Sequence, residues 1–221
     1  MRALSKWHVL IGGFLAYLFD AMEIILLTIA LPVIRQDLGL TFNEAGMLAS
    51  ATLLGIGLSG ITTGWYCDNY GRRKALLISL IVFGVLTTLV ATMHNWGLLL
   101  LLRFLSGLGL GGVWGIVSAY VTETWPAHQR ARAIGFVLSS FPIGAAIAAM
   151  VAASYLPDWQ TLFMVAGIST LIPLAYLFFF VPESPEWTAQ KIHNMAGPRQ
   201  HKHVSIREIF SPELLRLTLL G

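Results

Sequence analysis

Six apolar runs dominate this sequence, and each is long enough to cross a lipid bilayer. They cover residues 7–34, 45–66, 75–94, 96–121, 133–156 and 159–181. A membrane-spanning helix needs about 20 mainly apolar residues. Because lipid offers the backbone no hydrogen-bond partners, a run of this kind has to form a helix. The sequence therefore predicts an all-α membrane protein with six transmembrane helices joined by short connections.

The composition supports this class and argues against others. Hydrophobic residues make up 56% of the chain and charged residues only 11%, whereas soluble domains carry about 25% charged residues. Cys67 is the single cysteine, so no intrachain disulfide is possible. The sequence offers no paired metal ligands, no nucleophile with a nearby His in one span and no cofactor motif. We therefore expect neither an enzyme nor a cofactor or metal site.

The basic residues indicate how the chain is oriented in the membrane. Cytoplasmic loops carry an excess of Lys and Arg, and the loops on the opposite side contain only Arg35. This predicts a multi-pass protein of the plasma (inner) membrane with a cytoplasmic amino terminus. Because the basic residues lie in short loops, the pI near 9.2 does not indicate a nucleic-acid partner. The residues assigned to the cytoplasmic side are Arg2, Lys6, Arg72, Arg73, Lys74, Arg130, Arg132, Lys191, Arg199, Lys202 and Arg207.

The sequence divides into three parts. Residues 1–181 are predicted to form the six-helix bundle, and residues 182–210, which are richer in polar residues, a cytoplasmic linker. Ser211, Pro212 and Glu213 form a helix-start signal, with a capping Ser, Pro at the first helical position and an acid in the first turn. The apolar run after them is too short to span. Residues 211–221 are therefore expected to be the start of a truncated seventh transmembrane helix, and the chain to be half of a larger protein.

Charged residues lie inside two of the predicted spans. Asp20 and Glu23 are in the middle of the first run, and their i, i+3 spacing places them on one helical face. Each buried charge costs about 2.5–3.5 kcal/mol on an insertion scale, so such residues usually serve a function. The alternative is that the two acids are solvated near a frayed helix end.

Arg103, in the fourth span, is expected to lie at the same depth. It is about 10 Å below the outer face and Asp20 is about 20 Å above the inner one, taking a rise of about 1.5 Å per residue. In a hydrocarbon core about 30 Å thick these depths coincide, so Asp20 or Glu23 can face Arg103. Such a cluster can bind an anionic substrate and a proton, or it can be a structural ion pair.

Glycines are concentrated in the second and fourth spans. The pairs Gly60 and Gly64, Gly107 and Gly111, and Gly111 and Gly115 have the small-xxx-small spacing that permits close helix packing. Spans 1–3 and 4–6 also form two units of similar length and opposite orientation. Inverted repeats of this kind place binding groups near the membrane midplane, where the buried charges of spans 1 and 4 are expected.

Two motifs resemble those of the major facilitator superfamily. The loop after the second span resembles G-x-x-x-D-[RK]-x-G-[RK]-[RK] and departs from it at Asn69, where a basic residue is usual. The stretch from Arg103 to Gly111 resembles the fourth-helix motif R-x-x-x-G-x-G-x-G. The resemblance implies the amino-terminal half of a twelve-helix fold, and it puts in doubt any conformational lock that requires a cation at position 69. The loop motif keeps Gly64, Asp68, Gly71, Arg72 and Arg73.

Within that superfamily the sequence is similar to the aromatic-acid and sialic-acid type proton symporters. Residues 120–132 resemble an E-x-x-P-x-x-x-R loop, and Asp20-x-x-Glu23 resembles the D-x-x-[DE] pattern of the proton-coupled carboxylate members. The resemblance implies that Asp20, Glu23 and Arg103 bind protons or substrate. It also implies a gating network at the cytoplasmic side, made of Gly64, Asp68, Gly71, Arg72, Arg73, Glu123 and Arg130.

These observations favour a secondary active transporter that takes up a small organic anion, an aromatic or sugar-derived carboxylate, together with protons by alternating access. Arg103 would compensate the substrate carboxylate. The expected partners are the anion, protons, the lipid bilayer and a second six-helix half. Two alternatives remain open: a porter for a sugar or another neutral metabolite, and an inactive half-transporter.

Overall fold

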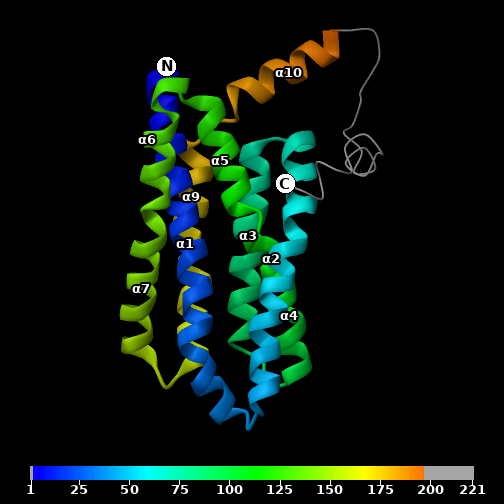
Figure 1. Ribbon diagram of the computed structural model, residues 1–221, viewed down its shortest axis with the longest axis vertical. Coiled ribbons are helices and arrows are strands. Elements are labelled where there is room, and N and C mark those ends of the chain that lie inside the picture. Colours follow the sequence, from blue (N-terminus) through cyan, green and yellow to red (C-terminus); the bar gives the residue numbers. More distant parts are fainter. Residues whose placement is uncertain (1, 197–221) are drawn as a thin grey trace.

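A computed structural model describes residues 2–196 (Figure 1). The predicted helix start at 211–221 and the last part of the predicted linker lie outside the described residues. The described chain folds into α-helices that run side by side along the long axis, with one further helix across an end (Figure 1).

Six apolar spans are present, as the sequence predicts. The first three are single helices, and the last three each consist of two consecutive helices; the spans cover Ser5–Asp37, Phe42–Tyr70, Arg72–Val90, Trp96–Thr124, Ala127–Tyr155 and Trp159–Phe180. The helices are α1 (Arg2–Asp37), α2 (Phe42–Tyr70), α3 (Arg72–Val90), α4 (Trp96–Leu110), α5 (Val113–Thr124), α6 (Ala127–Leu138), α7 (Ser140–Tyr155), α8 (Trp159–Ser169), α9 (Leu171–Phe180) and α10 (Pro185–Ala196).

Proline accounts for two of the breaks within spans. Pro142 follows the α6–α7 break and Pro173 the α8–α9 break by three residues each. A proline lacks the N–H that would bond to the carbonyl four residues earlier and its ring clashes with that carbonyl, so the helix kinks there. The α4–α5 break instead falls at Gly111 and Gly112. Backbone freedom is largest at glycine, which makes this pair a weak point in the fourth span.

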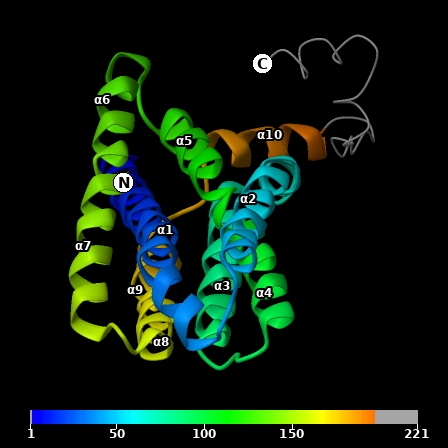
Figure 2. The ribbon, with the colours of Figure 1, turned by 60° about the horizontal axis from the view of Figure 1, so that its bottom comes forward.

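The helices pack across the two predicted repeats. Span 1 (α1) packs mainly against span 5 (α7), and span 2 (α2) against span 4 (α4), while α3 contacts both α4 and α8. Figures 1 and 2 show α1, α6, α7, α8 and α9 on one side and α2, α3 and α4 on the other. The two three-helix units are therefore interleaved, and charged residues of spans 1 and 4 can meet inside the bundle.

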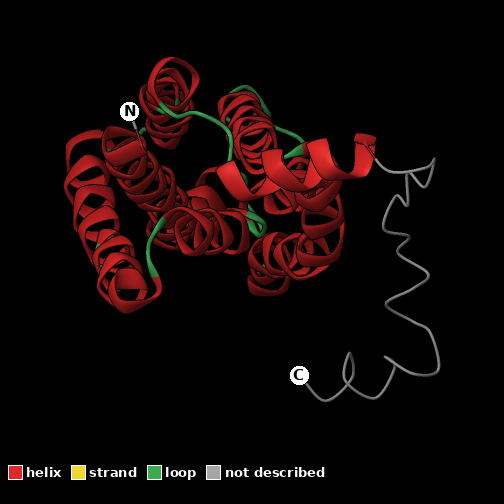
Figure 3. Cartoon of the chain, turned by 90° about the horizontal axis from the view of Figure 1, so that it is seen from above, coloured by secondary structure: helices red, strands yellow, loops and turns green. Residues whose placement is uncertain are grey.

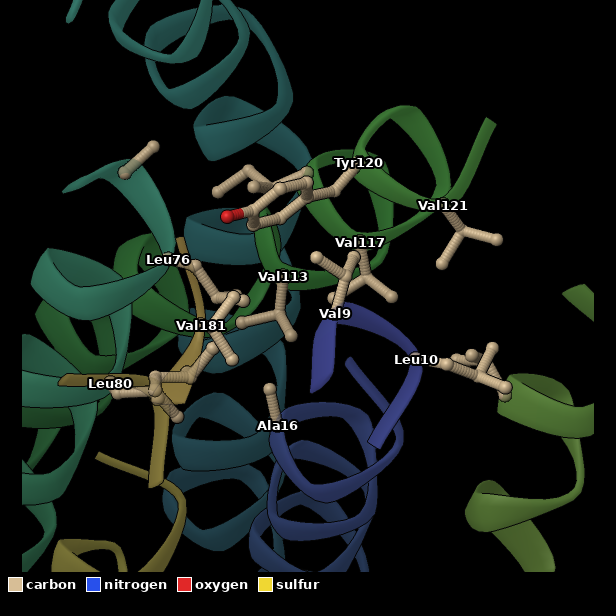
Figure 4. Close-up of a cluster of buried hydrophobic side chains, with 14 of the residues drawn as sticks. Val9, Leu10, Ala16, Leu76, Leu80, Val113, Val117, Tyr120, Val121 and Val181 are labelled. Atoms are coloured by element: carbon tan, nitrogen blue, oxygen red, sulfur yellow. The ribbon is translucent and has the colours of Figure 1, made fainter. Parts of the chain in front are cut away.

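Two apolar clusters fill the bundle, one toward each end. The first includes Val9, Leu80, Val117 and Tyr120 and lies toward the start of α1 (Figure 4). The second includes Leu26 and Phe163 and lies further along the same helix. Along α1 the first cluster ends at Ala16 and the second begins at Leu18. Asp20 and Glu23 lie just beyond this junction, well inside the bundle.

The glycines divide into two groups that the sequence pattern does not distinguish. A Cβ at Gly55, Gly107 or Gly111 would meet the backbone of the facing helix, so α2 and α4 approach closely along these residues. The predicted contacts of Gly60, Gly64 and Gly115 are absent: a Cβ at these positions would meet nothing within 4 Å. These three glycines line a hollow of about 240 Å³ between α2 and α5, because the two helices diverge there.

Part of the predicted linker is helical. Helix α10 runs across the end of the bundle (Figure 3). Its start has the same signal as residues 211–213: Ser184 Oγ accepts from the backbone N–H of Trp187 at 3.3 Å, and Pro185 takes the first helical position. The Trp187 indole also donates to the carbonyl of Asp68 at 2.8 Å, which ties α10 to the end of α2.

Candidate functional site

The centre of the candidate site is an ion pair between α1 and α4. Arg103 Nη1 lies 2.8 Å from Glu23 Oε1, and Thr87 Oγ1 on α3 donates to the same oxygen at 2.7 Å. Glu23 and Arg103 are each only 2% exposed. Three helices thus converge on one carboxylate oxygen, and of the two candidate acids it is Glu23 that pairs with Arg103.

The arginine has a second neighbour on span 6. Its guanidinium carbon lies 4.3 Å from the ring centroid of Phe163 on α8, within the range of a cation–π contact. Within residues 2–196, Arg103 Nη2 is buried and has no hydrogen-bond partner. The cation is therefore held by one carboxylate and one aromatic face, with a donor left unused.

Asp20 is in a different environment from Glu23. It is 5% exposed, and in the described part of the chain its Oδ1 is buried without a hydrogen-bond partner. The cluster therefore contains two carboxyl groups and one guanidinium, with the second carboxyl unpaired. Burying an unpaired charge is expensive, and no described group compensates a charge on Asp20 by a direct bond.

Three aromatic rings lie on the helices beside Asp20, and sequence reasoning missed them. Tyr17 precedes Asp20 by one helical turn, and its ring centroid is 5.0 Å from Trp114 on α5 and 5.6 Å from Phe141 on α7. All three residues are partly exposed. The i, i+3 spacing of Tyr17 and Asp20 could have placed these two side chains on one face of the helix. The two other rings come from spans that only folding brings together.

Three of the residues predicted to form a gating network, Asp68, Arg72 and Glu123, meet in a cluster around Arg72. Its Nη2 lies 2.7 Å from Glu123 Oε1 and 3.1 Å from Asp68 Oδ1, and its Nη1 donates to the carbonyl of Cys67 at 3.0 Å. Asp68 lies in the last turn of α2, Arg72 begins α3 and Glu123 lies in the last turn of α5. One guanidinium therefore connects three helix ends.

The other predicted network members are not joined to this cluster by side-chain bonds. Arg130 Nε donates to the carbonyl of Trp125 at 3.1 Å, which braces its own loop. The guanidinium of Arg73 donates to the carbonyl of Phe178 on α9. Gly64 lines the hollow between α2 and α5. Gly71 has φ 106° between α2 and α3, a conformation that side chains rarely tolerate.

Two residues that sequence reasoning assigned to the linker bond to residues beside the Arg72 cluster. Glu183 Oε1 accepts from the backbone N–H of Arg73 at 3.0 Å, at the start of α3, where a carboxylate is favoured by the helix dipole. Ser184 Oγ donates to Glu123 Oε2. The Tyr120 hydroxyl donates to the carbonyl of Pro182. The sequence signal that could have indicated these contacts is an acid and a hydroxyl, Glu183 and Ser184, between two prolines.

The described residues offer no alternative metal centre, since residues 2–196 contain no group of three or more His, Cys, Asp or Glu side chains placed to hold an ion.

The relatives of this chain are transporters. It is 34% identical over 182 residues to the cis,cis-muconate transport protein of Acinetobacter baylyi, covering 81% of this chain and 44% of that protein. It is 29% identical over 197 residues to the 4-hydroxybenzoate transporter PcaK of the same organism, covering 88% and 43%. It is 28% identical over 184 residues to the sialic acid transporter NanX of Escherichia coli, covering 82% and 45%. The chain thus spans less than half the length of these relatives.

A solved structure has the same fold. The proton:xylose symporter XylE matches 100% of this chain with a TM-score of 0.75 at 18% identity, and the match covers 52% of XylE. The sequence model described as Major Facilitator Superfamily matches residues 9–221. Two motifs, six spans and the bundle topology agree with that match, and the chain therefore belongs to the Major Facilitator Superfamily.

Proposed function

We propose that this chain forms the amino-terminal half of a proton-coupled carrier for small organic anions. The observation that carries the proposal is the burial of Asp20, Glu23 and Arg103 in the bundle, where Arg103 pairs with Glu23 and Asp20 is left without a partner. A proton on the unpaired acid neutralises the cluster, and its release leaves a net negative charge at membrane depth, which is costly. The conformations that the bundle can adopt therefore depend on whether Asp20 carries a proton.

The division of roles follows from the geometry. Asp20, with an unpaired oxygen, is the proton acceptor. Glu23 and Arg103 bind each other and are held by Thr87 and Phe163. In this proposal the Glu23–Arg103 pair determines the electrostatic environment of Asp20 in both the outward-facing and the inward-facing state. Arg103 also keeps an unused donor, Nη2, with which it can compensate a substrate carboxylate when the pair rearranges.

The organic-anion class is supported by the relatives, two of which are named for carboxylates and one for sialic acid. Tyr17, Trp114 and Phe141 add a cluster of rings beside Asp20. Offset or edge-to-face ring contacts contribute about 0.5–1.5 kcal/mol beyond area burial. Within the proposed class these rings favour a carboxylate attached to a planar ring.

Alternating access requires a contact that opens and closes. In this proposal the amino terminus and α10 are cytoplasmic, and the Arg72–Glu123–Asp68 cluster with Glu183 and Ser184 holds that end of the half together. A second six-helix half completes the transport path, and the two halves rock around the midplane.

The test uses proteoliposomes that contain the product of the full reading frame encoding this sequence. With an imposed proton gradient, uptake of a panel of organic anions and neutral sugars is measured for the unchanged protein, for Asp20→Asn and for Arg103→Ala. Asp20→Asn is expected to abolish uphill uptake while retaining substrate exchange at equal pH. Arg103→Ala is expected to abolish uphill uptake as well.

The matched control is Asp158→Asn, which removes one carboxylate at the end of the bundle away from the amino terminus. Asp158 caps α8 by accepting from the N–H of Thr161 at 3.0 Å, and Asn caps a helix as well as Asp does. This variant should accumulate substrate normally. Normal proton-driven accumulation by Asp20→Asn would remove Asp20 from the mechanism, and uptake of neutral sugars alone would overturn the proposed substrate class.

A further inference from the structure

A hollow of about 580 Å³ lies between α1 and α6, outside the buried charge cluster and the gating network. Its lining includes Trp7 and Ile11 from α1, Trp125 from the α5–α6 connection, and Arg132 and Phe136 from α6. The volume lies in the range of ligand sites, about 300–1,000 Å³. Neither the proton site nor the gate uses this space.

The interior of the hollow is apolar. Trp7 is 52%, Phe136 47% and Ile11 40% exposed, although each of them faces a concave surface. The ring of Phe136 stacks on Phe14 with centroids 4.8 Å apart, which fixes one wall. Such a wall is suited to a hydrocarbon chain.

The rim carries a positive charge with no acid to neutralise it. Within residues 2–196, Arg132 has no ion-pair or hydrogen-bond partner, and Gln129 stands beside it on the lining. Lys6 lies nearby, with Nζ 4.7 Å from the ring centroid of Trp125. Lys6 also borders a second hollow, whose lining includes Glu123 and Glu186. Among the residues that line the hollow between α1 and α6, Arg132 is the cation.

The hollow lies near one end of the helices, which is where lipid headgroups are expected. Trp7 is five residues into α1 and Arg132 five residues into α6, so both lie about 7–8 Å from the helix starts at about 1.5 Å per residue. Trp residues are enriched at membrane–water interfaces, and basic sites between transmembrane helices bind anionic headgroups. An apolar helix seated here would bury Arg132 without a partner, which is costly, whereas a headgroup phosphate satisfies it.

We propose that this hollow binds one anionic phospholipid from the leaflet at the amino-terminal side, with the phosphate at Arg132 and an acyl chain against Ile11 and Phe136. Lipid bound there bridges α1 and α6, the first and fifth spans. The site is independent of the proposed transport activity, because it shares no residue with the proton site or with the Arg72 cluster.

The test measures lipid binding to the purified chain in detergent by native mass spectrometry. Phosphatidylglycerol and phosphatidylcholine with identical acyl chains are titrated against the unchanged chain, Arg132→Gln and Lys74→Gln. Lys74 is exposed at the same end of the bundle and does not line the hollow, so it controls for the loss of one positive charge. Thermal unfolding of each variant checks that it remains folded.

One phosphatidylglycerol per chain is expected to bind at least fivefold more tightly than phosphatidylcholine, since one cation near an anionic lipid contributes about that factor. Arg132→Gln should remove this preference, and Lys74→Gln should change it less than twofold. Ile11→Trp, which fills the apolar part, should weaken both lipids. Equal effects of Arg132→Gln and Lys74→Gln, or no preference for phosphatidylglycerol, would overturn the proposal. Loss of the preference in the full reading frame product would show that protein covers the hollow, which would also overturn it.

Discussion

Arg103 on α4 contacts Glu23 on α1 through a single pair of atoms, Nη1 and Oε1, 2.8 Å apart, while Asp20, one turn earlier on the same helix, keeps a buried oxygen without a partner. Asp20 and Glu23, which the sequence pattern places on the same face of α1, thus have different surroundings. The Glu23–Arg103 pair is therefore expected to contribute to stability, and Asp20 is the residue proposed to bind the proton.

The ion pair is expected to matter most when only one partner is removed. Removing one member of a buried pair leaves the other uncompensated and costs about 3–5 kcal/mol. Glu23→Gln should therefore lower the free energy of unfolding in detergent micelles by about that amount, and the double variant Glu23→Gln with Arg103→Met should recover part of it. Thr87→Val, which removes one hydrogen bond to the same oxygen, should cost about 1–3 kcal/mol. Additive losses in the double variant would contradict this account.

The glycines of the fourth span provide a matched pair. At Gly107 an added Cβ would meet the carbonyl of Thr52 on α2, whereas at Gly115 it would meet nothing within 4 Å. Alanine is the better helix former at both positions, so that benefit cancels between the two variants. Gly107→Ala should be about 1–3 kcal/mol less stable than Gly115→Ala because of overpacking. Equal unfolding free energies for the two would show that α2 and α4 can separate freely at this contact.

Cys67 can report on the proposed gating role of the Arg72 cluster because it is the only cysteine in the sequence. It is 4% exposed, and its carbonyl accepts from Arg72 Nη1. Glu123→Gln weakens the partner of Arg72, so the loop should open more often and a hydrophilic maleimide should label Cys67 about tenfold faster, a factor that corresponds to about 1.4 kcal/mol.

The control for this labelling experiment is Glu186→Gln, an exposed acid on α10 at the same end of the bundle that has no bond to Arg72. Its labelling rate should match that of the unchanged chain. An unchanged rate in Glu123→Gln would mean that Arg72 does not hold this end closed.

The connection between α2 and α3 should be intolerant of side chains. Gly71 has φ 106°, and an added Cβ would meet the carboxylate of Glu183; Gly39 has φ 62° with nothing within 4 Å. A left-handed conformation costs a non-glycine residue about 1–2 kcal/mol. Gly39→Ala should lose only the free energy of that strain. Gly71→Ala should be less stable by a further margin for two reasons: φ 106° with ψ 155° is a conformation that essentially only glycine adopts, and the added Cβ displaces Glu183 from the start of α3. Urea or thermal unfolding of both variants provides the comparison, and equal losses would contradict both reasons.

The sequence by itself determined the number of spans and their approximate limits, and it predicted that charges of the first and fourth spans could meet. Long apolar runs have to be helical in lipid, because no water is present to satisfy the backbone, and a helix rises by a fixed amount per residue. The motif around Asp68 and Arg72 likewise placed a charged turn between two spans. These features depend on local chemistry, which a linear pattern contains.

The tertiary structure decided which groups touch. Asp20 and Glu23 are about 60° apart on α1, so a small rotation of the helix selects which of them reaches Arg103. That rotation is set mainly by packing against α5 and α7. The same holds for Gly107 and Gly115, which share a spacing pattern but face a packed helix and an open hollow, and for Glu183, which reaches α3 across 110 residues of sequence. Rotation and convergence of helices depend on contacts between distant segments, and no local pattern records them.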